Sequence, residues 1–211
     1  DALTALCRLL ATLHDDQGNV AIAGLATAPA PALEYPPERL RAESGLLDGV
    51  GWIGTGSFVE RMWCKPAISV IALDATPVDK ASNTLIPAAR AKISARVAPG
   101  DDPGKALAAL ITHLKDHAPW GARVTVSEGE ASEPSVIDFT GPYADAARAA
   151  FTQAWGVEPV LIGQGGSIPM VADFSQAFPD ATILITAVGD PDSRAHGANE
   201  SLHLGEFEKV C

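Results

Sequence analysis

The feature that most constrains the fold is the order of hydrophobic patterns in the first part of the chain. Apolar residues recur at helical spacing over residues 1–13 and 103–116, whereas β-branched or alternating runs occupy 67–73, 91–97 and 122–127. The first pattern is typical of amphipathic helices and the second of strands. The order helix, strand, strand, helix, strand predicts an α+β domain, with an antiparallel sheet and both helices on one face. A strand ahead of the first helix is missing from this pattern.

Local signals place the starts of the two helices. Asp1 can cap the first, and the pair Asp102-Pro103 provides a cap and a first-turn proline for the second. The second helix should bury one stripe of side chains: Leu107, Leu110, Ile111 and Leu114. Between the first helix and the first strand, prolines over residues 26–37 and glycines over 49–57 predict a long irregular excursion, which is often a functional loop or an oligomer contact.

The remainder of the chain has a different rhythm. A polar stretch over residues 128–142 separates it from the first part, and a helix is expected over 143–155. Apolar runs at 159–162 and 181–188 are predicted to be buried strands, with a helix between them and another at the C-terminus. This is the rhythm of an α/β unit that is too small to be a domain alone. We therefore expect a boundary between domains at 1–135 and 136–211.

Composition excludes several kinds of partner. The formal net charge of −11 leaves no basic stripe for nucleic acid. No apolar run approaches the roughly 20 residues that span a bilayer, and no secretory signal is recognised. The three cysteines form no CxxC motif and are expected to be free thiols in a reducing cytoplasm.

Two segments of the second part carry residue types that bind charged groups. Residues 163–169 read Gly-Gln-Gly-Gly-Ser-Ile-Pro, a glycine-rich turn between an apolar run and an amphipathic stretch. Backbone N–H groups and a hydroxyl at such a junction can hold an anionic group. The next loop delivers the imidazole of His196. A serine and a histidine on neighbouring loops are compatible with a site but do not define its chemistry.

Three segments, taken in order, resemble the zinc-dependent exopeptidases of the carnosinase, aminoacylase and carboxypeptidase G type, and most closely their dipeptidase branch. They are Asn83-Thr-Leu-Ile-Pro87 followed by Ser94-Ala-Arg96, then Gly165-Gly-Ser-Ile-Pro169, and finally His196-Gly-Ala-Asn-Glu200. The resemblance covers essentially the whole chain.

The resemblance implies a two-domain enzyme, in which a catalytic α/β domain binds two zinc ions and an inserted lid domain makes the dimer contact. Residues 1–135 would be the lid without its first strand, and 136–211 the C-terminal part of the catalytic domain. The family's other metal ligands and its catalytic glutamate precede the lid, so the resemblance places no catalytic residue in this chain. We expect a C-terminal fragment that has no peptidase activity alone and does not retain a complete zinc site.

The resemblance also implies individual roles. His196 would be a zinc ligand, for which a neutral imidazole is suited. Arg96, the hydroxyl of Ser167 and the backbone of Gly166 would bind the terminal carboxylate of the substrate, and Thr84 would reach the substrate in the cleft of the partner subunit. We expect Arg96, Ser167 and His196 to converge on one cleft. Each residue also has a purely structural interpretation: a surface histidine, a solvent-facing arginine, or a turn-forming serine or threonine.

The expected function is that of a di-zinc metallopeptidase that hydrolyses dipeptides, related short peptides or N-acyl amino acids and forms a homodimer through its lid. The alternative is a non-catalytic dimerisation module of the same fold. A third interpretation, a serine-dependent amidase, would require a Gly-x-Ser-x-Gly elbow, whereas Ile168-Pro169 follow Ser167.

Overall fold

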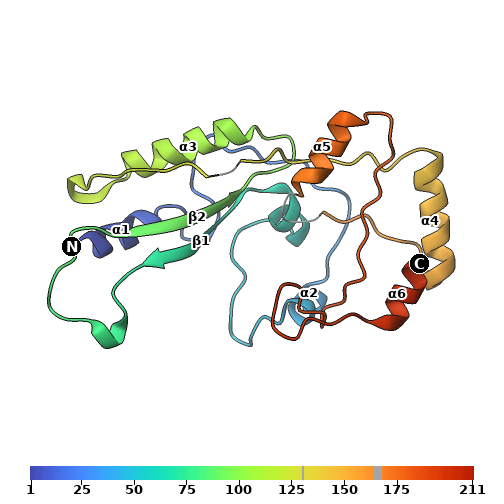
Figure 1. The fold of residues 1–211 in the computed structure, drawn as a ribbon, viewed down its shortest axis with the longest axis horizontal. Helices are drawn as coiled ribbons and strands as arrows, with labels where there is room; N and C mark the ends of the chain where they lie inside the picture. The colour runs from blue at the N-terminus through green and yellow to red at the C-terminus, as the bar shows by residue number, and fades with distance from the viewer. Residues whose placement is uncertain (130, 164–167) are drawn as a thin grey trace. The chain divides into compact units, whose positions relative to one another are not determined.

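The computed structural model describes residues 1–129, 131–163 and 168–211 (Figure 1). The chain divides into two compact units. Unit 1 consists mainly of Asp1–Glu34 and Gly51–Ser135. Unit 2 consists of Tyr35–Val50, Val136–Gly163 and Met170–Cys211. The division at residues 135 and 136 into a lid and a catalytic portion stays a prediction.

Unit 1 has the predicted order of helix, strand, strand and helix. Its main elements are α1 (Ala2–Ala11), β1 (Ala67–Asp74), β2 (Arg90–Arg96) and α3 (Pro103–Asp116). Short helical turns at Glu60–Cys64, Val78–Lys80 and Pro119–Gly121 complete the unit.

Strands β1 and β2 form an antiparallel pair. Ala67 lies opposite Arg96 and Asp74 opposite Arg90, with a register shift between Val70 and Ala72. Ile71 is therefore an extra residue on β1, a bulge that bends the strand locally.

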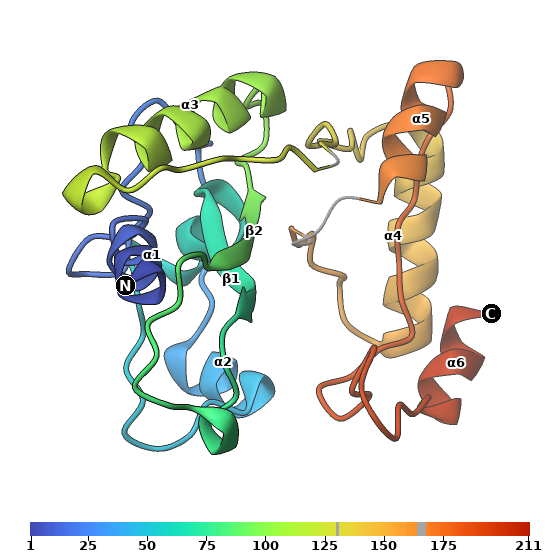
Figure 2. The same ribbon diagram turned by 60° about the vertical axis from the view of Figure 1, so that its left-hand side comes forward.

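The core of unit 1 joins both helices to the hairpin. Its buried apolar side chains come from α1, α3, β1 and the segment after α1: Leu9, Leu13, Ile22, Ile68, Leu110 and Leu114. Ile93 of β2 packs against the same cluster, and Figure 2 shows α1 and α3 beside the hairpin. The predicted α+β arrangement is thus confirmed.

Local capping explains where the two helices begin. The carboxylate of Asp1 accepts a hydrogen bond from the Thr4 N–H at 2.9 Å, and that of Asp102 accepts one from the Lys105 N–H at 3.0 Å. Each bond satisfies a backbone donor that has no partner within the helix. Both predicted starts are therefore confirmed.

The buried face of α3 differs from the predicted stripe. The buried residues are Ala106, Leu110, His113 and Leu114, whereas Leu107 and Ile111 are only half-buried. The face is rotated because the His113 imidazole packs against the end of α1 at Thr12. The predicted stripe contained only apolar residues and therefore missed the imidazole of His113.

Residues 122–127 were predicted to form a third strand, and that prediction was wrong. They run along α3 (Figures 1 and 2), and Val124 and Val126 pack on the core in the alternating manner of a strand. Among the described residues, however, no backbone hydrogen bond joins this segment to β2, and the sheet contains only β1 and β2. Alternation fixes which side chains face inward, but a strand also requires a neighbour.

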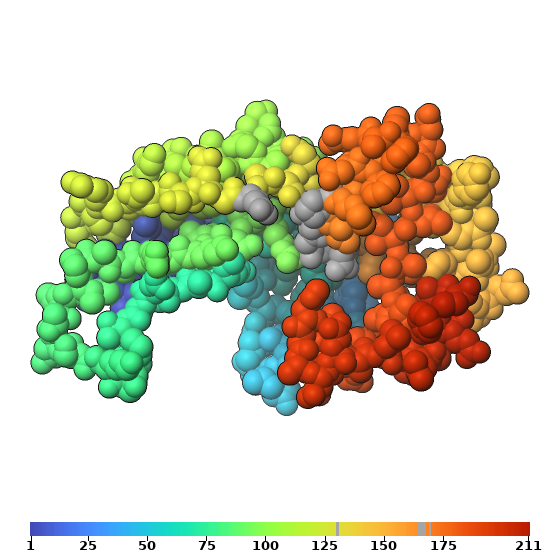
Figure 3. All heavy atoms as spheres, viewed as in Figure 1, coloured from blue at the N-terminus to red at the C-terminus, as the bar shows by residue number. Residues whose placement is uncertain are grey.

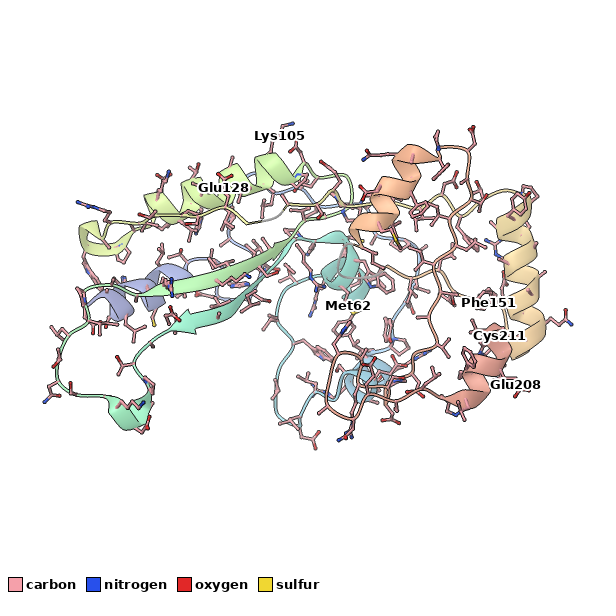
Figure 4. The ribbon with its side chains drawn as sticks, viewed as in Figure 1. Met62, Lys105, Glu128, Phe151, Glu208 and Cys211 are labelled. Atoms are coloured by element: carbon pink, nitrogen blue, oxygen red, sulfur yellow. The ribbon has the colours of Figure 1, made fainter. Side chains whose placement is uncertain are left out.

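Unit 2 is helical. Its helices are α2 (Pro37–Ser44), α4 (Pro142–Trp155), α5 (Pro169–Ala177) and α6 (Leu204–Val210). Helices α4 and α6 are in contact, because the Trp155 indole N–H donates to the Glu206 carboxylate at 2.5 Å and the Lys209 ammonium lies over the indole ring. Phe151 and Cys211 lie in this region (Figure 4).

The two apolar runs of unit 2 were predicted to be buried strands, which was also wrong. Within the described part of unit 2, neither 159–162 nor 181–188 is paired. Val160, Leu161 and Ile162 are 61, 54 and 65% exposed. The described residues of unit 2 offer these segments no strand to pair with. No described helix is long and apolar enough to cross a bilayer.

Candidate functional site

Arg96 is the last residue of β2, and its side chain is exposed. Among the described residues, none forms a hydrogen bond or an ion pair with its guanidinium. Arg90, at the other end of the same strand, is instead paired with Asp74, its cross-strand neighbour. Within the described part of the chain, the Arg96 guanidinium therefore has free donors, and its planar geometry can hold a carboxylate with two bonds.

Thr84 lies in the connection between β1 and β2. Its side chain is exposed, and its backbone N–H donates to the Ser82 hydroxyl at 3.3 Å. The connection is itself open to solvent, since Val78 is 93% and Leu85 74% exposed, and Figure 3 shows it standing off from the hairpin. Its exposed apolar side chains are available for contact with another surface.

The hairpin separates these two residues. Thr84 precedes the start of β2, whereas Arg96 ends it, and a strand of this length spans about 20 Å. Thr84 and Arg96 therefore lie toward opposite ends of the hairpin in one chain. This separation agrees with the expectation that Thr84 serves the cleft of a partner, which stays a prediction.

His196 belongs to unit 2 and sits in a tight turn. Its φ is 62°, in the left-handed region, and the Gly197 N–H donates to the Arg194 carbonyl at 2.8 Å. His196 is thus the third residue of a turn of type II character, a place that usually takes glycine or asparagine. Gly197 is required for close approach, because a Cβ there would lie 2.9 Å from the Arg194 carbonyl oxygen.

The loop that carries His196 is closed by Ser193, which is 7% exposed. The Ser193 hydroxyl accepts from the Asp190 N–H and donates to the Asp190 carboxylate, both at 2.9 Å. The Ser193 carbonyl accepts from the Ser201 N–H at 3.0 Å. The ends of the loop are thereby fixed while the imidazole of His196 remains exposed.

The described residues do not supply a complete metal site. No group of three or more histidine, cysteine, aspartate or glutamate side chains suited to a metal occurs among the described residues. His196 fits as a single ligand, since its imidazole is exposed and none of the described residues hydrogen-bonds to it. A complete metal site would need further ligands.

Gly166 and Ser167 lie outside the described residues. Arg96 and Thr84 belong to unit 1 and His196 to unit 2, so the convergence of Arg96, Ser167 and His196 on one cleft stays a prediction.

Two residues with structural roles were missed by the sequence analysis. His113, on α3, is buried against the end of α1, and Ser193 closes the His196 loop. A signal for a closed turn was present, because an aspartate side chain commonly accepts a hydrogen bond from the backbone N–H two residues on, as Asp190 does from Asp192. Nothing in the sequence distinguished His113 from the other histidines, since its burial depends on which helix packs against it.

Comparison with solved structures gives the class of fold. The chain is similar to the dipeptidase Dug1p from Saccharomyces cerevisiae, with a TM-score of 0.79, 24% identity, and coverage of 98% of this chain and 46% of that one. For human carnosine dipeptidase 1 the values are 0.77, 21%, 99% and 47%. For the M20 family metallo-carboxypeptidase Sso-CP2 from Sulfolobus solfataricus they are 0.75, 20%, 98% and 49%. At these identities the likeness concerns the fold.

The chain belongs to the M20 peptidase dimerisation domain family, whose model matches residues 1–122. Among curated relatives, the cysteinylglycine-S-conjugate dipeptidase of Corynebacterium striatum is 33% identical over all of this chain and 47% of its own length. The Cys-Gly metallodipeptidase DUG1 of Saccharomyces cerevisiae is 26% identical over 96% of this chain and 44% of its own length. The β-Ala-His dipeptidase of Rattus norvegicus is 24% identical over 98% and 44%. The chain thus spans about half the length of the curated relatives it matches.

Proposed function

We propose that this chain is part of a metal-dependent dipeptidase that hydrolyses Cys-Gly or a related dipeptide. The observation that carries the proposal is that the chain matches a cysteinylglycine-S-conjugate dipeptidase along its whole length, beyond the dimerisation domain into the segment that contains His196. The alternative of a non-catalytic dimerisation module is less well supported, because these relatives are named dipeptidases and match both units.

In this proposal, His196 is one ligand of a zinc site whose other ligands come from outside the described residues. A zinc ion would lower the pKa of bound water and polarise the peptide carbonyl. The residues of this chain would bind and orient the substrate. Arg96 would hold the terminal carboxylate of the substrate with charge-assisted hydrogen bonds, together with the Gly166 backbone and the Ser167 hydroxyl. Fixing that carboxylate restricts the substrate to short peptides.

We also propose a homodimer in which Thr84 reaches the substrate bound by the partner. The family is defined by dimerisation, and unit 1 has an apolar surface that suits it. Val70, Ile71 and Leu73 on β1 are 45, 55 and 44% exposed. A dimer through this surface would cover these side chains. Sedimentation of the chain should give twice the mass of one copy, and a charged residue in place of Ile71 should shift it toward the monomer.

The catalytic proposal is tested in a longer protein that contains this chain and hydrolyses Cys-Gly. Arg96→Ala should raise the KM for Cys-Gly by about 10- to 100-fold, the range expected for lost charge-assisted hydrogen bonds. The matched control is Arg90→Ala, which removes an arginine from the other end of the same strand and only an exposed ion pair. Cys-Gly amide, which has no carboxylate, should be cleaved equally by the wild type and Arg96→Ala.

The outcomes separate the roles. An equal loss with Cys-Gly and its amide would show that Arg96 does not bind the carboxylate. His196→Ala should reduce the bound zinc measured by metal analysis, and a variant that retains the full zinc content would contradict the ligand role.

A further inference from the structure

The loop from Asp190 to Ser201 contains three non-glycine residues with positive φ and is closed by a hydrogen bond from the Ser201 N–H to the Ser193 carbonyl. Arg194, His196 and Asn199 have φ values of 52, 62 and 60°, although none is glycine. A positive φ raises the free energy of a residue that has a side chain. Such a residue keeps this conformation only where the surrounding structure enforces it.

Ser193 has the only buried polar side chain described in unit 2. Ser193 is 7% exposed, and His113, the other buried polar residue described, belongs to unit 1. The Ser193 hydroxyl accepts from the Asp190 N–H and donates to the Asp190 carboxylate, and that carboxylate also accepts from the Asp192 N–H at 3.0 Å. We name these bonds between Asp190 and Ser193 the serine clasp.

The clasp acts on the turn through the backbone. Ser193 immediately precedes Arg194, whose carbonyl accepts the hydrogen bond of the His196 turn. The Ser193 carbonyl binds the Ser201 N–H on the far side of that turn. One buried residue therefore fixes both ends of the segment in which His196 must keep a positive φ.

We propose that Ser193 is a positioning residue, whose clasp to Asp190 holds His196 in the left-handed turn that presents its imidazole. The inference rests on the proposed role of His196 as a metal ligand, since a single ligand must be aimed before the others can share a metal with it. Ser193 itself touches neither metal nor substrate. Without the clasp, the His196 backbone relaxes toward negative φ and the imidazole loses its fixed direction.

The test uses the full chain without metal or substrate. Trypsin cleaves after arginine, so the rate of cutting between Arg194 and Ala195 reports opening of the loop, and the cut after Arg148 in α4 is the internal reference. Ser193→Ala should raise the cut at Arg194 relative to Arg148 by about tenfold, the scale expected for lost buried hydrogen bonds. It should also shift the Cα resonance of His196 in the NMR spectrum.

Two variants serve as controls. Ser193→Thr keeps the hydroxyl and should restore slow cleavage. Ser201→Ala makes the same chemical change in the same loop. The Ser201 hydroxyl forms no hydrogen bond with any described residue, so this variant should be cut at the wild-type rate. An equal rise at Arg194 and Arg148 in Ser193→Ala would mean that Ser193 supports unit 2 in general, and would overturn the proposal.

The decisive measurement is a double-mutant cycle with His196→Gly. Glycine adopts positive φ without strain, so the clasp has less to hold in that background. Ser193→Ala should then raise the relative cut at Arg194 by less than about threefold, and this reduction measures the coupling between the two positions. The same tenfold rise in both backgrounds would overturn the proposal. If the coupling is found but His196→Ala leaves zinc content unchanged in the longer protein, the catalytic proposal fails while the clasp stands.

Discussion

Unit 1 should lose stability as the pH is lowered below about 6.5, because a buried histidine on α3 binds the end of α1. The His113 Nε2 lies 3.0 Å from both the carbonyl and the hydroxyl oxygen of Thr12. The Thr12 hydroxyl donates to the Leu9 carbonyl at 2.7 Å, so its oxygen accepts from the histidine. The hydrogen-bond network thus assigns the proton of neutral His113 to Nε2.

The surroundings of His113 disfavour a second proton. Burial lowers the pKa of His113 below its usual value of 6.5, and the neighbouring His117 lowers it further. The Thr12 carbonyl and the Asp116 carboxylate act in the opposite direction. The His117 ring is stacked on that of His113 with 4.0 Å between their centroids, so two protonated rings would face each other.

The sign and size of the effect follow from proton linkage. Between the lowered pKa in the folded state and about 6.5, the unfolded chain binds more protons at this position. The free energy of unfolding is therefore highest above about pH 6.5 and falls as the pH drops, by at most about 1.4 kcal/mol per pH unit. The loss ends below the folded-state pKa, where both states are protonated.

Urea unfolding of the full chain at a series of pH values measures this slope. His113→Gln should remove it, since glutamine does not titrate in this range, and the difference between the two curves isolates His113 from the other histidines. His117→Gln should reduce the slope, because it removes the repulsion but leaves the burial. If His113→Gln has the same pH dependence as the wild type, the reasoning about the buried imidazole is refuted.

Three further predictions concern the folded chain. Leu13→Ala removes a side chain that is 0% exposed in the unit 1 core and should lower the free energy of unfolding by about 3 kcal/mol. Gly18→Ala places a Cβ 2.6 Å from the Ile53 Cβ at a φ of +81°, so it should lower the melting temperature more than Gly100→Ala, which has a φ of +83° and nothing within 4 Å. The 211-residue chain alone should not hydrolyse dipeptides with or without added zinc, and measured turnover would contradict the placement of the catalytic residues elsewhere.

Helices were predictable because their signals are local. The carboxylates of Asp1 and Asp102 bind N–H groups only three residues away. The periodicity of α3 identified a buried face, but the sequence could not show that His113 belongs to it. That burial depends on Thr12, which lies 101 residues away and supplies the hydrogen bonds that make a buried imidazole tolerable.

In the candidate site too, the sequence identified side chains but not the contacts that fix their backbone. The resemblance of Ser94-Ala-Arg96 to the family pattern selected Arg96, and its role as a carboxylate-binding residue stays a prediction. The left-handed conformation of His196 was not predictable from its side chain, because non-glycine residues seldom adopt it. In our proposal this conformation depends on the serine clasp. The sequence therefore identified the His196 imidazole but not the hydrogen bonds that hold its backbone.

The unpaired segments show why strand pattern alone is insufficient evidence for a sheet. Neighbouring side chains of an extended chain point to opposite faces, so the exposure of Val160, Leu161 and Ile162 in succession means that neither face of this segment is covered. Its composition is that of a strand buried on both faces, as in a parallel sheet with helices on each side. Burying it requires neighbouring strands, which no described part of unit 2 provides. Residues 159–162 therefore have the apolar composition of a buried strand, in a chain that spans only about half the length of its relatives.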